Sequence, residues 1–501
     1  MNIFRTVFLF HATTCVLLAG VSGCKGWAVG PDYREPEIMA PSVPLPDAGY
    51  PTTNKTATGE FKVAEAKDDP RHEITADSIR SWWNQFNDDI LTNLVEAAVS
   101  NNISFLMAQQ RLLQARWQLV GSAADFLPSV SLDGTYTRSG AHKFTSSRWG
   151  SGKNYHGDHW KSGFDASWEI DIFGGKRRAY ESAEASMESA NWSLADAWVT
   201  LTSEIGSQYI SLRTTQERLR VARANLKLQS ETYDILKSRL DSGIGDELAV
   251  NQAKYNVEQT RASIPGLLVQ EEKLMNALAI LAGTMPGALH PLLRELPDRD
   301  WLVAPRRLAD IPLDAMRARP DVKVAERNLA AQVAQVGVAE SMLFPKFYIN
   351  GSFGLDSVEA NKLFRRHAFL ASIGPSFSWP IFQGGNLVAN MKVAEAKMDE
   401  AALKYELAVQ TAFEEARNAY SSYTQEYHRY QSLQGAVKAA RAAVDISNDL
   451  YKNGLADFNN VLDAQRSLLT LEESLTISRG NISIDLISLY KALGGGIAVE
   501  E

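Results

Sequence analysis

The sequence predicts a mainly α-helical chain that also carries membrane β-strands, in which long antiparallel coiled-coil hairpins follow pairs of strands and the arrangement occurs twice. Three observations predict this fold class. Matching residues recur at one constant offset, prolines are absent from long stretches, and four short segments alternate apolar with polar residues. The 501 residues are 45% hydrophobic, enough for a sizeable core, and the net charge of −8 argues against nucleic acid as a partner.

The N-terminus predicts a cleaved signal and a lipid anchor. Residues 1–23 form a signal peptide, because Arg5 precedes an apolar stretch that is too short and too interrupted to span a bilayer. The segment ends in Val21-Ser22-Gly23-Cys24, which resembles a bacterial lipobox. Cys24 is therefore expected to carry a diacylglycerol and an N-acyl chain, and no other cofactor is expected. The alternative is an ordinary signal peptide that happens to contain a cysteine.

The segment after the anchor is expected to be a tether. Residues 24–80 are rich in proline, which predicts an extended lipid-anchored chain. Position 25 is Lys25, whereas an aspartate there usually marks retention in the inner membrane, so the outer membrane is the expected location. The only other cysteine, Cys15, lies in the removed segment, and the mature chain is expected to contain no disulfide.

An internal two-fold repeat organises the rest of the chain. Trp168 matches Trp379, Asp246 matches Asp457 and Gly283 matches Gly494, each at an offset of 211 residues. Repeat 1 is predicted to span residues 81–285 and repeat 2 residues 320–496, each with a helix, two strands and a helical hairpin. The intervening residues, 286–319, are dense in proline and predict an irregular connector.

The helical hairpins are predicted at 176–283 and 386–493, with turns at Gly243 and Gly454. Proline is absent from 129 to 264 and from 381 to the end, and both copies show apolar residues at heptad spacing. A single helix over 176–241 would be about 100 Å long. The predicted seam positions are Ala183, Met187, Ala190, Leu194, Ala197 and Leu201, then Met398, Ala402, Tyr405, Val409, Ala412, Ala416, Ala419 and Tyr423.

The strands are predicted at 129–138, 162–172, 346–355 and 368–379, where residues alternate between apolar and polar. Their length and alternation suit tilted membrane strands, although a soluble half-buried sheet would alternate too. Four strands cannot close a barrel, and open edges cannot stand in hydrocarbon because their backbone groups would remain unpaired. The chain must then oligomerise, and three protomers would supply the twelve strands of a transmembrane β-barrel.

The motifs resemble those of a known family. In order, they are Val29-Gly30-Pro31-Asp32-Tyr33, Ser81-Trp82-Trp83, Arg319-Pro320-Asp321, Tyr451-Lys452-Asn453-Gly454-Leu455, Val461-Leu462-Asp463-Ala464-Gln465-Arg466 and Leu489-Tyr490-Lys491-Ala492-Leu493-Gly494-Gly495-Gly496. Together they are similar to the TolC-type outer membrane factors, in the lipoprotein branch (NodT- and OprM-like) that serves resistance-nodulation-division (RND) efflux pumps. The usual Trp after the triple glycine is Ile497 here.

The resemblance implies the following function. A homotrimer would form a twelve-stranded barrel in outer-membrane lipid and a helical barrel in the periplasm, with the 286–319 connector in an equatorial region. It would be a passive gated duct of a tripartite efflux system and not an enzyme. Its partners would be a periplasmic adaptor (membrane fusion) protein and an inner-membrane pump. The exported molecule, whether drug, solvent, metal cation or other, is not indicated, nor is the open or closed state.

Individual residues also carry expected roles. The resemblance implies that Asp463 forms an acidic ring at the periplasmic aperture and that Arg466 helps to hold this aperture shut. Asn459 stands where some members have an apolar constriction residue, and Tyr451 is either a latch or a packing residue. The resemblance places adaptor docking at the hairpin tips, represented by Gly243, Asp246, Gly454, Leu455 and Asp457, whereas helix capping alone would explain both aspartates.

Rival signals are weaker. His156 and His159 lie in a polar segment without further metal ligands nearby, so no metal site is expected, and no set of residues suggests catalysis. Two other functions stay open at this point. One is an outer-membrane duct for type I protein secretion, and the other is a lipid-anchored periplasmic structural coiled-coil protein.

Overall fold

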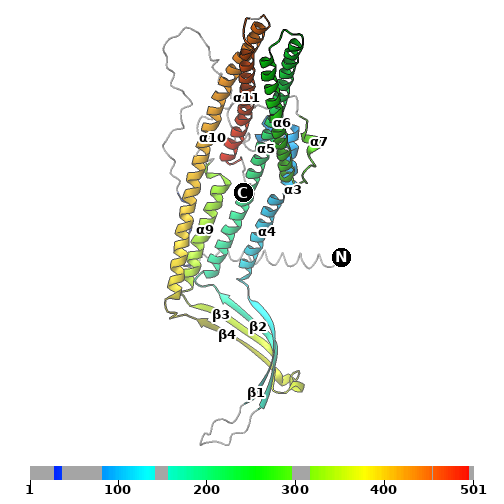
Figure 1. Ribbon diagram of the computed structural model, residues 1–501. Coiled ribbons are helices and arrows are strands. Elements are labelled where there is room, and N and C mark those ends of the chain that lie inside the picture. The colour runs from blue at the N-terminus through cyan, green and yellow to red at the C-terminus, as the bar shows by residue number, and fades with distance from the viewer. Residues whose placement is uncertain (1–27, 37–81, 141–155, 296–315, 454, 496–501) are drawn as a thin grey trace, which may run out of the picture. The chain divides into compact units, whose positions relative to one another are not determined.

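A computed structural model of the chain describes residues 28–36, 82–140, 156–295, 316–453 and 455–495 (Figure 1). The backbone divides into two compact units, which are described separately. Unit 1 draws on residues up to 36, 112–190 and 325–405, and unit 2 on 37–111, 191–324 and 406–501. The predicted signal peptide, Cys24, most of the tether, Gly454 and Ile497 lie outside the described residues.

Unit 1 contains a four-stranded antiparallel sheet in the order β1-β2-β3-β4. The strands are β1 (Ser129–Gly140), β2 (His156–Ile170), β3 (Lys346–Ser357) and β4 (Phe369–Ser378). All four strand predictions correspond to strands, but β2 begins at His156 instead of 162 and ends at Ile170 instead of 172. It ends early because the side chain of Asp171 turns back to accept hydrogen bonds from the next helix.

The strand register places the apolar residues on one face. Leu132 lies opposite Phe164, Phe164 opposite Phe353, and Phe353 opposite Ala371, so one alternation continues across every strand. The other face carries mainly polar residues, such as Ser131, Asp165 and Asn350. Apolar side chains that soluble proteins would normally bury are exposed here, including Ile373 at 82% and Phe377 at 69%.

The helices of unit 1 pack around its N-terminal segment. The unit holds the start of α5 (Gly175–Asp241), most of α9 (Pro320–Ser341), the end of α4 (Ile103–Ala124) and the start of α10 (Asn386–Lys452). The predicted seam of α5 is only half-buried here. The fully buried line is instead Arg178, Ser182, Ala185 and Ser189, because α9 covers this face and supplies polar partners such as Gln335 for Ser182.

A similar correction applies to α10. Ala402, a predicted seam residue, is exposed, and its neighbour Ala401 is buried against Leu329 and Val333 of α9. The rest of the predicted seam is largely internal, since Tyr405, Ala412, Ala416 and Tyr423 are all buried.

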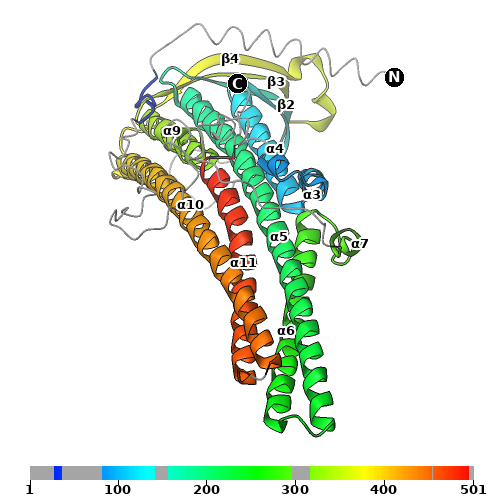
Figure 2. The same cartoon turned by 90° about the horizontal axis from the view of Figure 1, so that it is seen from above.

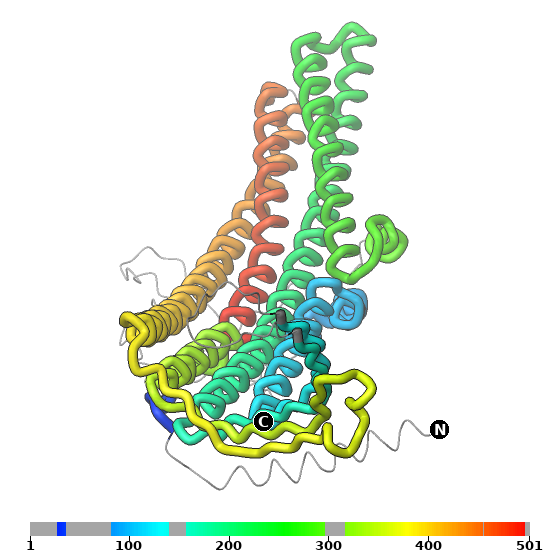
Figure 3. Tube along the Cα trace, turned by 90° about the horizontal axis from the view of Figure 1, so that it is seen from below, coloured from blue at the N-terminus to red at the C-terminus, as the bar shows by residue number. Residues whose placement is uncertain are grey.

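Unit 2 is helical. It contains a 3-10 turn η2 (Trp82–Phe86), α3 (Asp89–Asn101), the start of α4, the rest of α5 and α10, α6 (Glu247–Leu281), α7 (His290–Leu293) and α11 (Phe458–Ala492). Figures 2 and 3 show α6 running back along α5 and α11 running back along α10. The main core gathers around Trp82, which stacks on Tyr490 with ring centroids 6.3 Å apart.

The two hairpins have equal helix lengths. Helices α5 and α10 each contain 67 residues, and α6 and α11 each contain 35. Helix α6 continues through Pro265, although a proline in a helix interior removes one backbone hydrogen bond and costs about 3 kcal/mol. None of the helices in the described residues combines the length and apolarity needed to cross a membrane.

Candidate functional site

The two hairpin tips of unit 2 are closed by equivalent caps. The Asp246 carboxylate accepts a hydrogen bond from the Leu248 N–H at 2.9 Å, and the Asp457 carboxylate accepts from the Asn459 N–H at 3.1 Å. Both aspartates therefore satisfy free N–H groups at a helix start, the role that capping predicts. Gly243 adopts a φ of +74°, which favours glycine.

The tip interior is a small apolar cluster that includes Leu236, Val250, Phe458 and Leu462. Tyr451 packs against this cluster with its ring 5.3 Å from that of Phe458. This contact is the packing alternative for Tyr451, and a latch role stays a prediction. The outer surface of the tips is also apolar, since Ile244, Leu248 and Leu455 are 80%, 60% and 75% exposed.

Three of the residues expected at the aperture, Asp463, Asn459 and Arg466, lie on α11, and the fourth, Tyr451, lies near the end of α10. Asp463 and Asn459 are exposed, and the Asp463 carboxylate makes no hydrogen bond or ion pair within the described part of the chain. Arg466 instead reaches α6, where its Nε donates to Asn256 Oδ1 at 2.7 Å and its guanidinium lies 5.4 Å from the Tyr255 ring centre. Arg466 thus joins the second hairpin to the first.

Arg319 forms a second polar centre in unit 2, which sequence reasoning did not identify. Its buried guanidinium donates to both carboxylate oxygens of Asp321, at 3.0 and 2.7 Å, and to the Ala492 carbonyl at the end of α11, at 2.8 Å. Its Nη2 also donates to Glu415 Oε2 on α10, at 2.6 Å. Gly494 passes beside the Arg319 side chain at a φ of +87°, so two of the sequence motifs meet here.

The bonds of Arg319 differ in strength because the partners differ in exposure. The Arg319 side chain is 6% exposed, and a buried donor of this kind that loses its acceptor costs about 1–3 kcal/mol or more. The Glu415 side chain is 51% exposed, and an ion pair with so exposed a partner contributes about 1 kcal/mol at most. Asp196 of α5 lies in the same electrostatic environment, where burial and the charge of Asp321 raise its pKa.

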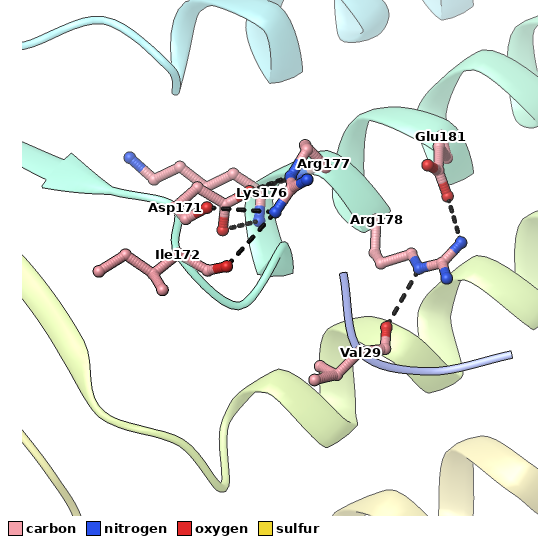
Figure 4. A network of polar contacts seen from close by, with 7 residues as sticks. All are labelled: Val29, Asp171, Ile172, Lys176, Arg177, Arg178 and Glu181. Carbon is pink, nitrogen blue, oxygen red and sulfur yellow. Dashed lines mark hydrogen bonds and ion pairs between the residues drawn. The ribbon is translucent and has the colours of Figure 1, made fainter. Parts of the chain in front are cut away.

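In unit 1 the N-terminal strap, defined here as residues 28–33, is bound by Arg178 (Figure 4). Arg178 donates to the carbonyls of Val29 and Gly30, both at 3.1 Å, and to the carboxylate of Asp32 at 2.7 Å. The Glu181 carboxylate accepts from its remaining nitrogen at 2.8 Å. A segment predicted as part of a tether is therefore held in a fixed place on α5.

Tyr33 secures the other end of the strap. Its ring packs on Ala185 of α5 and on Ala330 and Ala331 of α9, and its hydroxyl donates to Glu326 at 3.2 Å. Burial is the main reason that the pKa of Tyr33 is raised, so the hydroxyl stays protonated as the donor.

The junction between β2 and α5 is rigidly capped (Figure 4). The Asp171 carboxylate accepts from the N–H groups of Lys176 and Arg177 at 3.1 and 3.0 Å, and the Arg177 side chain donates to the Asp171 and Ile172 carbonyls. A carboxylate at a helix start is favoured by the helix dipole. The orientation of α5 is thus fixed relative to the last residues of β2.

The two matched tryptophans make matching bonds at the sheet border. Trp168 Nε1 donates to the Phe126 carbonyl at 2.8 Å, and Trp379 Nε1 donates to the Leu343 carbonyl at 3.1 Å. Each indole therefore ties the end of one strand to the turn that precedes the neighbouring strand.

One histidine of the polar segment contacts a carboxylate on the neighbouring strand. His159 Nε2 lies 2.8 Å from Asp356 Oδ1 on β3. Within the described residues, no group of three or more His, Cys, Asp or Glu side chains is placed to hold a metal ion.

The chain is similar to known proteins over most of its length. The family model described as "Outer membrane efflux protein" matches residues 94–284 and 312–495. Nodulation protein T of Rhizobium leguminosarum bv. trifolii is 30% identical over 455 residues, covering 91% of each chain. The probable outer membrane lipoprotein SilC of Salmonella typhimurium is 26% identical over 500 residues, covering 97% of this chain and 98% of SilC. The solved outer-membrane channel OprN is 31% identical with a TM-score of 0.81, covering 93% and 99% of the two chains.

Proposed function

Because the chain belongs to the outer membrane efflux protein family and is an outer-membrane efflux component, we propose that three copies form one gated duct. Small molecules pass along this duct without chemical change, and no residue has a catalytic role. The duct is one part of a tripartite system of the RND type, in which an inner-membrane pump supplies the energy.

The exposed apolar face of the sheet carries this proposal. A four-stranded sheet with apolar residues exposed on one face and open edges at β1 and β4 is incomplete by itself. Pairing β1 of one copy with β4 of the next satisfies both edges, and twelve strands enclose an aqueous lumen with lipid outside. A periplasmic coiled-coil spacer leaves the exposed apolar face unexplained.

Cys24 is the proposed lipid attachment site. Its support is the lipobox in the sequence and the similarity to SilC, a probable outer membrane lipoprotein. The acyl chains would hold the N-terminus at the outer membrane while the helices extend into the periplasm.

The proposed aperture lies at Asp463, with Asn459 one turn away on α11. Three exposed Asp463 carboxylates around a symmetry axis produce a focused negative potential, which favours cations over anions. Arg466 keeps the aperture narrow because its hydrogen bond to Asn256 ties the second hairpin to the first.

The hairpin tips are the proposed docking surface for the adaptor. The ends of both hairpins expose apolar side chains, namely Ile244, Leu248 and Leu455. The turn conformation there depends on Gly243 and on the helix caps formed by Asp246 and Asp457. A partner that covers these side chains gains hydrophobic energy and can pull the hairpins apart.

Single-channel recording in planar lipid bilayers tests the proposal. A trimer purified from outer membranes is expected to give small cation-selective openings, and Asp463→Ala combined with Arg466→Ala is expected to raise the conductance severalfold. Arg223→Ala, at an exposed position of α5, serves as the control and should leave the conductance unchanged. A monomer without conductance would contradict the duct, and a normal conductance in the double variant would contradict the aperture assignment.

A further inference from the structure

We propose that Arg319 and Glu415 form a releasable joint, which holds α10 to the end of α11 in the closed duct and separates when the duct opens. This inference rests on the proposed function and adds a control point to it. The joint is built from the Arg319-Pro320-Asp321 motif, and its contacts lie within unit 2.

One side of the joint is permanent. Arg319 Nη1 donates to the Ala492 carbonyl at the C-terminal end of α11, and the guanidinium binds Asp321 with two hydrogen bonds. The Arg319 side chain is buried, and Gly494 passes so close that a Cβ atom at this position would lie 3.4 Å from Arg319 Cγ. Breaking these bonds would leave a buried cation without acceptors, which is strongly unfavourable.

The other side of the joint can be released. Glu415 contributes a single hydrogen bond through Oε2, and half of its side chain is already exposed to water. When Glu415 leaves, its carboxylate becomes hydrated, and the guanidinium keeps both bonds to Asp321 and its bond to Ala492. No buried charge is left without a partner, so releasing Glu415 from Arg319 costs little free energy. Releasing Arg319 from Asp321 and Ala492 would cost much more.

The surrounding charge favours release. Asp196 of α5, Asp321 and Glu415 face two cations, Arg319 and Lys491 of α11, which leaves one negative charge in excess. Burial is the main reason that the pKa of Asp196 is raised, and the negative charges of Asp321 and Glu415 raise it further. Repulsion among these carboxylates displaces Glu415 more easily than Asp321, because Arg319 donates one hydrogen bond to Glu415 and two to Asp321.

The small side chains of α10 beside Glu415 also favour separation of α10 from the end of α11. Ala412 and Ala416, which precede and follow Glu415 on α10, are both 0% exposed. Alanine is the smallest apolar side chain, so lifting α10 at this point exposes little apolar surface. The buried position of Ala416 also provides a probe of the joint.

The experiment measures the accessibility of a thiol introduced by Ala416→Cys in the purified full-length trimer. Maleimide labelling is followed in the otherwise unchanged chain, in Glu415→Ala and in Glu414→Ala. Glu414 is a matched control, because it is the adjacent exposed residue of α10 and its carboxylate accepts, among the described residues, only from Asn418 of the same helix. Chains without Ala416→Cys give the background from Cys24.

Glu415→Ala is expected to accelerate labelling about fivefold, the factor that corresponds to losing one exposed ion pair. Glu414→Ala should label at the unchanged rate, and Glu415→Gln should give an intermediate rate with the same side-chain volume. Single-channel conductance should rise in Glu415→Ala. A melting temperature close to that of the parent chain in both variants excludes general unfolding.

The outcomes separate the joint from the duct. Equal labelling of Glu415→Ala and Glu414→Ala overturns the joint, even if the parent chain conducts normally. Faster labelling in Glu415→Ala alone supports the joint, even if no chain conducts. The missing conductance would then contradict the proposed duct and not the joint.

Discussion

At the residue scale, two arginines organise the two units in the same way. Arg178 binds the carbonyls of Val29 and Gly30, and Arg319 binds the carbonyl of Ala492. A guanidinium presents several donors in one plane, so one buried side chain can bind a passing backbone and a carboxylate together. Both arginines therefore connect segments that are far apart in the sequence.

Asp485 of α11 is a half-buried acid that forms no ion pair with a cation among the described residues. Burial and the negative charge of Glu426 on α10 raise its pKa to about 6. One buried oxygen of Glu426 also lacks a hydrogen-bond donor within the described residues. The negative charge at this helix pair is therefore a source of instability at neutral pH.

We predict that Asp485→Asn stabilises the folded chain at pH 8 by about 1–2 kcal/mol, after allowance for its partial exposure. The folded pKa lies above the unfolded pKa, so the native aspartate contributes stability below about pH 4 and loses it as the pH rises through 6. Thermal unfolding at pH 4 and pH 8 measures the effect. Asp445→Asn, at an exposed position of α10, should show no such pH dependence. A gain for Asp485→Asn that is equal at both pH values would contradict this assignment.

At the element scale, the tip between α5 and α6 depends on a glycine for space. A Cβ atom on Gly245 would lie 2.4 Å from the Leu240 backbone nitrogen, which is closer than atoms can approach. The turn must therefore shift if this position carries a side chain. A Cβ atom on Gly266, inside α6, would meet no neighbouring atom within 4 Å.

The two glycines should respond in opposite directions to alanine. Gly245→Ala is expected to destabilise the chain by about 1–3 kcal/mol because the backbone must move. Gly266→Ala is expected to stabilise it by up to about 1 kcal/mol, since alanine is the better helix former. Chemical denaturation of both variants measures the difference, and a neutral Gly245→Ala would show that the tip is looser than described.

Local patterns predicted the elements well, because helix and strand periodicity depend on neighbours in the sequence. The prolines and heptads indicated the long helices, and alternation indicated the apolar face of the sheet. The half-buried seam of α5 and the exposed Ala402 were predicted wrongly, because burial there depends on α9, which lies far away in the sequence. Helix α6 continues through Pro265 and ends at Leu281, within the hairpin predicted at 176–283.

The candidate site was less predictable. Capping by Asp246 and Asp457 follows from two adjacent residues and could be predicted. The bonds of Arg178 and Arg319 to main-chain carbonyls could not be predicted, since every residue has a carbonyl and the residue types do not show which one an arginine binds. Asp463, Asn459 and Arg466 keep their expected roles as proposals, although Arg466 contacts α6 and not Asp463.

At the scale of the whole molecule, the sheet offers a test of which face meets lipid. Ile373 lies on the apolar face of β4, and Thr135 lies on the opposite face of β1. Both residues are exposed in the single chain. They are matched positions for introducing the same charge.

Ile373→Arg is expected to disfavour membrane insertion by about 2–4 kcal/mol, because the charge would face hydrocarbon. Thr135→Arg should insert normally, because its side chain would face water in the lumen. The amount of heat-modifiable trimer in outer-membrane fractions measures both effects. Equal loss in the two variants would indicate that the sheet does not separate lipid from water.

The strap fixes how deeply the protein can sit in the outer membrane. Only four peptide units separate Cys24 from Ala28, and a fully extended chain of that length reaches about 14 Å. Arg178 clamps the following residues to the base of α5, close to where β2 ends. If Cys24 carries acyl chains, the leaflet surface must lie within that reach of Ala28. The bonds of Arg178 to the strap therefore determine the level of the membrane relative to the sheet.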